Sequence, residues 1–141
     1  MRKITAFLCT LALLLNMNFM VFAENKAPIF SAETVTAQAG ETIDVPVSVS
    51  GNSGILGAVL HVSYDKGLTL TGITKGEAFE SLMFTKPGDL SANPFNLVWD
   101  GAEADTTNGQ IAILTFTAPS TSGEYAIQIS CEDGDVIDND F

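Results

Sequence analysis

The stretch GILGAVLHVSYD, residues 54–65, alternates in a way that predicts one long β-strand with two different faces. One face is apolar enough to lie in a core: Ala58, Leu60, Val62 and Tyr64. The opposite face has neither lysine nor glutamate, although solvent normally covers such a face: Gly57, Val59, His61 and Ser63. His61 is the single histidine of the chain. We therefore predict that this second face meets another protein.

Alternation with a period of two recurs along the rest of the chain, and no amphipathic helical pattern of useful length interrupts it. It is clearest in five stretches: TIDVPVSVS (42–50), LTLTGI (68–73), FNLVWD (95–100), QIAILTFTA (110–118) and EYAIQIS (124–130). Turn-forming residues separate these stretches at Gly51-Asn52, Asp65-Lys66-Gly67, Asn108-Gly109 and Ser122-Gly123. Short strands between such turns predict an all-β sandwich.

Several positions in this pattern carry specific structural expectations. Pro46 points away from the apolar stripe of its strand and is best tolerated at a sheet edge or a bulge. Trp99 alternates with other apolar residues and is expected in the core, because burying its large apolar area is favourable. Either Ile113 or Leu114 faces inward. Residues 76–94 break the alternation and predict a broken strand or a helical turn.

Residues 1–23 have the composition of a signal peptide. A basic start, Met1-Arg2-Lys3, precedes a nearly uncharged apolar run that ends in Val21-Phe22-Ala23. We predict cleavage after Ala23 and hence a secreted protein. A retained membrane anchor is the alternative, since about 20 apolar residues can span a bilayer. Cys9 lies inside the run rather than at its end, which argues against a lipoprotein signal.

Residues 24–141 are of a length that suits one small domain. They hold all 17 acidic residues of the chain but only four strong cations, which are Lys26, Lys66, Lys75 and Lys86. This acidity argues against nucleic acid and against an anionic membrane as partners, because both require a basic patch. Cys131 is the only cysteine after residue 23, so no disulfide can form within the domain. Cys131 comes next in the apolar alternation of its strand, which favours a buried free thiol over a disulfide with another molecule.

The residue types needed for catalysis or metal binding are poorly represented. With His61 alone there is neither a zinc-binding histidine pair nor a catalytic triad. Carboxylate pairs such as Glu77 with Glu80 arise by chance among so many acids, so we predict that the protein is not an enzyme. Residues 132–141, EDGDVIDNDF, offer carboxylates that calcium prefers, but Gly134 comes too early for an EF-hand loop. A solvated turn is the favoured interpretation, and no cofactor is expected.

In order and spacing these segments resemble a cohesin module, the dockerin-binding domain of cellulosomal scaffoldins. The resemblance covers essentially all of residues 24–141. It is carried by Gly40 before the VPV strand (45–47), Gly54-Ile55, Tyr64-Asp65, and Asn108-Gly109 before AILTF (112–116). It implies a jelly-roll β-sandwich of about nine strands that binds a dockerin through one sheet face, with calcium held by the dockerin.

The resemblance also implies which residues meet the dockerin. That face in cohesins is formed largely by the third, fifth, sixth and eighth strands; residues 54–65 match the third and LVWDGAE (97–103) the sixth. The positions that would point toward the partner are Gly57, Val59, His61, Ser63, Asn96, Val98, Asp100 and, at the rim, Glu103. Val59 and His61 would then lack a charged neighbour because a helix of the partner covers them. The alternative is that Val59 is a lone exposed valine.

Two features depart from the family pattern. Cohesins often carry polar side chains where this chain has Gly57 and Val59, so its interface is expected to depend more on apolar burial, and the dockerin class is not implied. The chain reaches Phe141 where the last strand of the family should begin. We therefore expect a C-terminally truncated fragment of an extracellular protein, with further scaffoldin modules or a cell-surface attachment beyond it.

Two other functions are compatible with an all-β sandwich, since a fold does not fix a function. A carbohydrate-binding module needs exposed planar aromatics, but the tryptophan and both tyrosines lie on apparent core stripes. An adhesin-like or structural spacer domain would have no defined binding face. The substitution His61→Asp should abolish dockerin binding if the face is used, and should leave a spacer unaffected.

Overall fold

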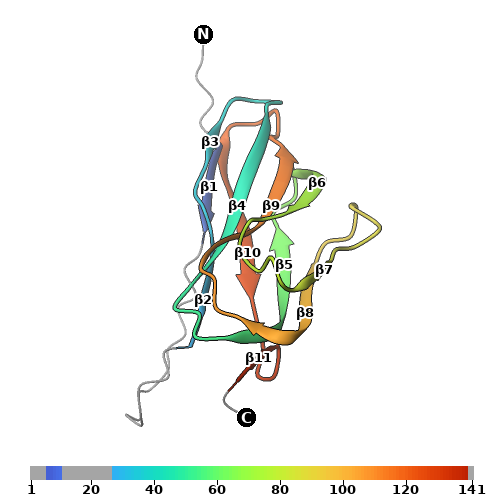
Figure 1. Ribbon diagram of the computed structural model, residues 1–141. Coiled ribbons are helices and arrows are strands. Elements are labelled where there is room, and N and C mark those ends of the chain that lie inside the picture. Colours follow the sequence, from blue (N-terminus) through green and yellow to red (C-terminus); the bar gives the residue numbers. More distant parts are fainter. Residues whose placement is uncertain (1–5, 11–26, 140–141) are drawn as a thin grey trace.

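The computed structural model describes residues 6–10 and 27–139, which form β-strands joined by turns and loops, without a helix (Figure 1). Within this described part there is accordingly no helix that could cross a membrane. The strands are β1 (Ala6–Thr10), β2 (Ile29–Ala32), β3 (Thr36–Ala37), β4 (Thr42–Ser50), β5 (Ile55–Tyr64), β6 (Thr69–Lys75), β7 (Met83–Thr85), β8 (Phe95–Asp105), β9 (Gly109–Thr117), β10 (Gly123–Ser130) and β11 (Val136–Asp138). The all-β prediction is confirmed.

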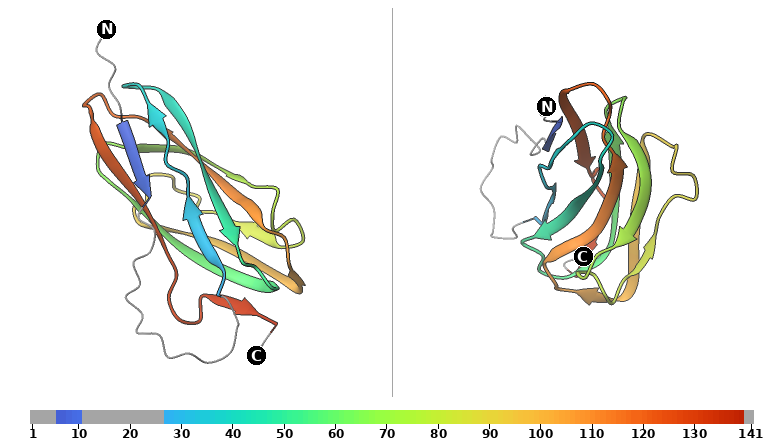
Figure 2. Two further views of the ribbon diagram at one scale, coloured as in Figure 1. Left: turned by 90° about the vertical axis from the view of Figure 1, so that its left-hand side faces the viewer. Right: turned by 90° about the horizontal axis from the view of Figure 1, so that it is seen from above.

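The strands form two sheets that pack face to face (Figure 2). Sheet A has the order β3-β1-β10-β5-β8-β7, and β11 pairs with β5 beyond the end of β10. Sheet B has the order β2-β4-β9-β6. Paired strands are antiparallel except for β1 and β10, which are parallel. The predicted sandwich is therefore present, with several strands of only two or three residues added to the expected set.

Alternating residues of the two sheets fill the space between them. Val45 on β4, Leu60 on β5, Leu97 on β8 and Leu114 on β9 have no exposed surface. Burying one such side chain contributes about 1.5–3 kcal/mol. Ile113, the neighbour of Leu114, is only half-buried and lies on the outer face of sheet B, so Leu114 is the core residue of that pair. The core stripe predicted for residues 54–65 is confirmed.

Pro46 was expected at a sheet edge or a bulge. β4 is not an edge strand, because it runs between β2 and β9, but its pairing with β9 shifts register just after Pro46, between Val47 and Ser48. The other side of β4 is also locally open, because β2 ends at Ala32, opposite Val47. On this side of β4, the Pro46 carbonyl accepts the Glu33 N–H at 3.0 Å. The proline nitrogen faces the same side, where no further strand residue is paired. A residue without an N–H group is therefore tolerated here without losing a bond of the ladder.

An aromatic cluster around Trp99 holds the irregular residues 76–94 against the core. Trp99 is 1% exposed, as its position in the alternation predicted. Phe79, wholly buried in the turn before β7, meets the Trp99 ring edge-on with centroids 5.9 Å apart. Phe84 on β7 stacks on the same ring at 5.0 Å. The irregular segment is thus a buried turn followed by a short strand, in agreement with the prediction of a broken strand.

The carboxylate of Asp105, only 5% exposed, ties the same turn to the end of β8. One oxygen accepts the Ser81 N–H at 3.3 Å and the Ser81 hydroxyl at 2.7 Å. The other accepts the Thr107 N–H at 2.8 Å and the Thr107 hydroxyl. Burial alone would raise the pKa of Asp105, but the hydrogen bonds from Thr107 and Ser81 outweigh it and lower the pKa below its ordinary value of 3.8.

Replacing Asp105 with alanine is expected to lower the free energy of unfolding at pH 7 by about 1–3 kcal/mol, because it leaves part-buried donors of Ser81 and Thr107 without an acceptor. The folded-state pKa is the lower one, so this stabilisation is present above pH 3.8 and is lost as the pH falls through the folded-state value. Urea unfolding at pH 7 and at pH 3 measures both effects. Glu77→Ala, an exposed acid in the same turn, serves as the control. An equal difference between Asp105→Ala and the parent protein at both pH values would contradict the expectation.

β1 lies within the predicted signal peptide. Its backbone pairs with β10 from Ala6 opposite Gly123 to Thr10 opposite Ile127, and with β3 on its other side. The predicted cleavage position after Ala23 lies outside the described residues, so the signal peptide stays a prediction.

Candidate partner-binding face

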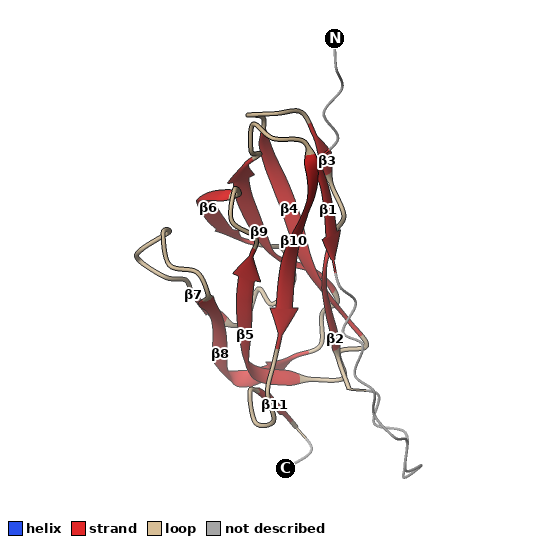
Figure 3. Cartoon of the chain, turned by 180° about the vertical axis from the view of Figure 1, so that it is seen from behind, coloured by secondary structure: helices blue, strands red, loops and turns tan. Residues whose placement is uncertain are grey.

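The outer face of sheet A brings together seven of the eight predicted partner-facing residues. β5 runs between β10 and β8 in the middle of this sheet (Figure 3). Along β5 and β8, Gly57 lies opposite Asp100, Val59 opposite Val98, and His61 opposite Asn96. Ser63 continues the row on β5, opposite Gln128 of β10. The alternation that predicted these positions is therefore preserved in the pairing.

Val59 and Val98 form the apolar centre of this face. They are directly paired across β5 and β8, and both side chains are half-buried. The β-branched pair is well suited to a pleated sheet and stabilises it by about 0.2–1 kcal/mol. Because both side chains keep part of their surface exposed, the pair offers a partner an apolar contact on a rigid element.

His61 is held by two acceptors, which was not predicted. Its Nε2 lies 2.9 Å from Oδ2 of Asp135, and its Nδ1 lies 2.8 Å from Oδ1 of Asn96. The same Asp135 oxygen accepts the Glu132 N–H at 2.6 Å, and the Asp135 carbonyl accepts the Val59 N–H at 2.8 Å. The expectation that His61 lacks a charged neighbour is therefore wrong. Asp135 was also expected in a solvated turn, whereas the structure packs it half-buried against β5.

This arrangement favours the charged form of His61, since only the imidazolium can donate from both ring nitrogens. The hydrogen bond to Asp135 raises the pKa of His61 above 6.5; burial opposes the shift, and Asn96 adds to it. The pKa of Asp135 is lowered below 3.8, chiefly by the hydrogen bond from the Glu132 N–H; burial opposes this shift, and His61 adds to it. When His61 is protonated, the outer face of sheet A thus carries an ion pair beside its apolar centre.

The substitution Asp135→Asn is expected to lower the pKa of His61 toward 6.5, because the neutral amide favours the imidazolium less. In the parent protein the folded-state pKa is the higher one, so the ion pair stabilises fully below pH 6.5 and its contribution is lost as the pH rises through the folded-state value. An NMR titration of the single histidine measures this directly. Asp133→Asn, an exposed acid in the same loop, is the control. An unchanged His61 pKa in Asp135→Asn would refute the role of the ion pair.

The other predicted residues differ in accessibility. Asp100 is exposed, whereas Gly57 opposite it is buried. A Cβ at Gly57 would lie 3.4 Å from the Trp99 carbonyl oxygen and 3.9 Å from Cδ1 of Ile137, so Ile137 covers this glycine. Glu103 is exposed, but it lies in the bulge of β8 between the residues paired with Gly57 and Ile55. Glu103 therefore lies outside the paired rows of the face, and its place at the rim of an interface stays a prediction.

Sequence reasoning missed two exposed apolar residues of this face, Met83 on β7 and Ile137 on β11. Met83 lies opposite Asp100, and Ile137 opposite Gly57. Both belong to strands of three residues, which are too short for alternation to reveal. An exposed methionine in an irregular segment was the only available signal.

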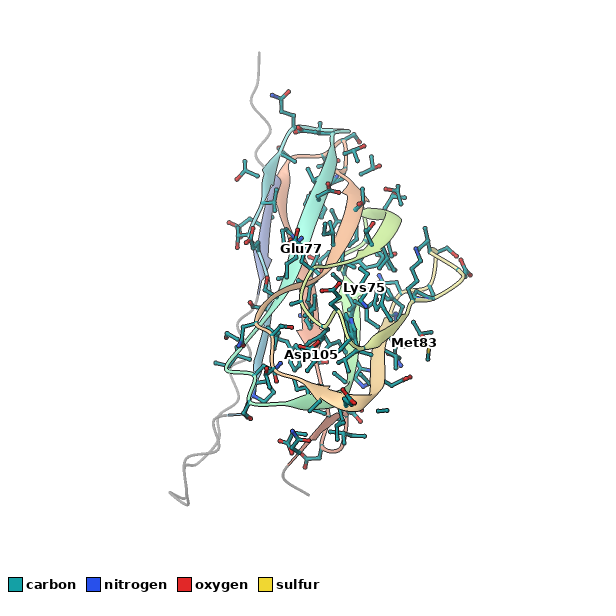
Figure 4. The ribbon with its side chains drawn as sticks, in the orientation of Figure 1. Lys75, Glu77, Met83 and Asp105 are labelled. Carbon is teal, nitrogen blue, oxygen red and sulfur yellow. The ribbon has the colours of Figure 1, made fainter. Side chains whose placement is uncertain are left out.

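A separate hollow lies beside the turn before β7, lined by Lys75, Gly76, Glu77 and Glu80. Figure 4 shows Lys75 and Glu77 there, whereas Met83 projects from the edge of sheet A. The Lys75 ammonium donates to the carbonyls of Glu80 at 3.2 Å and Leu82 at 2.7 Å. This lysine therefore fastens the turn. Among the described residues no group of three or more histidine, cysteine or acidic side chains could hold a metal ion.

Comparison with known proteins agrees with this architecture. The family model of the cohesin domain matches residues 29–140. No curated protein matches the chain. A type I cohesin–dockerin complex from Clostridium thermocellum is similar in fold, with a TM-score of 0.65 and 19% identity over 82% of this chain and 89% of that chain.

Two further solved structures share the fold. CaCohA2 from Clostridium acetobutylicum gives a TM-score of 0.61 and 19% identity over 80% of this chain and 79% of that chain. A non-cellulosomal cohesin from the archaeon Archaeoglobus fulgidus gives a TM-score of 0.53 and 17% identity over 70% and 74%. The family model spans nearly the whole part of the chain that forms the sandwich, from β2 onward. This chain belongs to the cohesin domain family.

Proposed function

We propose that this chain is a non-catalytic module that binds the dockerin domain of a partner protein through the outer face of sheet A. In doing so it would assemble polysaccharide-degrading enzymes into a cellulosome or attach them to the cell surface. The observation that carries the proposal is the Val59–Val98 pair at the centre of the outer face of a cohesin fold. Similar solved structures are described as cohesin–dockerin complexes, which supports the same class of partner.

The composition and position of this face fit a protein partner. Apolar residues lie at its centre, and exposed polar or acidic residues, Asn96, Asp100 and Glu103, lie around them. An apolar centre inside a polar rim is the usual organisation of a protein interface. The acidity of the domain would favour a dockerin with basic residues on its helices. The predicted leader would place this assembly outside the cell.

The alternative of a carbohydrate-binding module loses support. Trp99 is buried, and Tyr64 and Tyr125 are half-buried. The exposed large apolar side chains of the described residues are aliphatic or methionine: Ile29, Met83 and Ile137. None of these can provide a planar platform for a sugar ring.

A titration of the purified protein against a panel of dockerins tests the proposal. Calorimetry in calcium is expected to show one-to-one binding to at least one dockerin, and a chelator should abolish it because the dockerin would carry the calcium. A folded protein that binds no dockerin in the panel would overturn the proposal. A sugar array run in parallel tests the carbohydrate alternative.

A further inference from the structure

The described residues include three exposed large apolar side chains, and two of them belong to one row of one face. Met83 is 63% exposed, Ile137 42% and Ile29 65%. Ile29 lies on β2 of sheet B, whereas Met83 and Ile137 both lie on sheet A. Single exposed apolar residues need no explanation, but two in one row next to the Val59–Val98 pair favour a contact surface.

The row crosses four neighbouring strands. Met83 is opposite Asp100, Asp100 is opposite Gly57, and Gly57 is opposite Ile137. Strands lie about 4.8 Å apart, so the backbones of Met83 and Ile137 are separated by roughly 14 Å. An α-helix with its side chains is about 10–12 Å across. The space between the two apolar residues therefore matches the width of one helix.

The floor between these two residues is low on the side of Ile137, and the row next to it is apolar. Gly57 contributes no side chain, and Ile137 leans over it. The next row holds the half-buried Val98 and Val59. The carboxylate of Asp100 lies between Met83 and Gly57 as the polar group of this row, and it is exposed.

The charges around this row favour a helix that carries a basic residue. Of the described lysines, Lys75 and Lys86 bind backbone carbonyls of Leu82 and Ile73, and Lys66 lies in the turn after β5. No described lysine therefore lies in the row with Asp100. A cation on the incoming helix would supply the missing partner for this carboxylate.

We propose that Met83 and Ile137 are the side walls of a seat for a single dockerin helix, and that they determine which dockerin binds. The helix lies along β5 and β8, with apolar residues three or four positions apart against Met83, Val98 and Ile137. A lysine or arginine of that helix pairs with Asp100. This inference rests on the proposed dockerin binding and adds the residues that select the partner.

The test compares Met83→Ser, Ile137→Ser and the double variant with Ile29→Ser, the matched control on sheet B. Affinity for the tightest dockerin of the panel is measured by calorimetry in calcium, and thermal unfolding confirms that each variant is folded. Each wall variant should weaken binding about tenfold and the double variant more, whereas Ile29→Ser stays within about twofold. Asp100→Asn should reduce the dependence of the affinity on salt.

The outcomes separate this inference from the proposed function. Wall variants that stay within twofold, while another substitution on the outer face of sheet A abolishes binding, would overturn the seat alone. Failure of every dockerin to bind the parent protein would overturn both. If the free protein dimerises and the wall variants are monomeric without losing dockerin affinity, the walls serve a second copy of the chain and the inference is wrong.

Discussion

Replacing Trp99 with alanine is expected to lower the free energy of unfolding by about 3–5 kcal/mol, which is the usual cost of removing a buried aromatic side chain. Trp99 is 1% exposed and contacts two further rings, Phe79 edge-on and Phe84 by stacking. Its loss would leave a cavity and also release the turn and the strand that those rings anchor. A small domain has only about 5–15 kcal/mol of net stability, so the variant would be close to unfolding.

Chemical denaturation followed by far-ultraviolet circular dichroism measures this effect, because the substitution removes the only tryptophan as a fluorescent probe. Trp99→Phe is the matched control and should cost clearly less. It keeps most of the ring packing and removes an indole N–H that is buried without a hydrogen-bond partner in the described structure. A loss of less than about 1 kcal/mol in Trp99→Ala would show that the aromatic cluster is not a principal support of sheet A.

The sequence was informative wherever alternation alone determines the position of a side chain. In a strand the period is two, so an apolar stripe such as the one through Leu60 fixes the opposite face as well. This is why Val59 and Val98 were both predicted to point outward, and the structure places them opposite each other. Alternation did not decide whether Ile113 or Leu114 of residues 110–118 faces inward. β9 pairs with β4 through a register shift there, so the period of two is interrupted along this strand.

Contacts between distant segments were beyond the reach of the sequence. The His61–Asp135 ion pair joins residues 74 positions apart through a loop whose fold depends on its own backbone hydrogen bonds. Met83 and Ile137 lie in three-residue strands, whose register is set by the longer strands they join. Pro46 was assigned to an edge or a bulge, because neither the early end of β2 nor the register shift after Val47 can be read from local composition.

The largest effect on binding is expected from Val59→Asp, which should weaken dockerin affinity about a thousandfold. In the free protein a carboxylate at this half-buried position stays in contact with water. Once a partner covers the face, the same charge would be buried without an ion-pair partner, at a cost of about 3–5 kcal/mol. The ion pair of His61 with Asp135 cannot compensate, because the imidazolium already has both its donors engaged.

Ile113→Asp is the matched control for this prediction, because it places the same charge on another half-buried branched residue of a central strand. Ile113 lies on β9 of sheet B, and its outer face is remote from the proposed contact. Calorimetry on both variants, with thermal unfolding to confirm folding, should show a near-complete loss for Val59→Asp and a change within about twofold for Ile113→Asp. If both variants lose affinity equally, added negative charge on the domain accounts for the loss. If neither does, the outer face of sheet A is not where the dockerin binds, and the proposed interface must be moved to another surface of the sandwich.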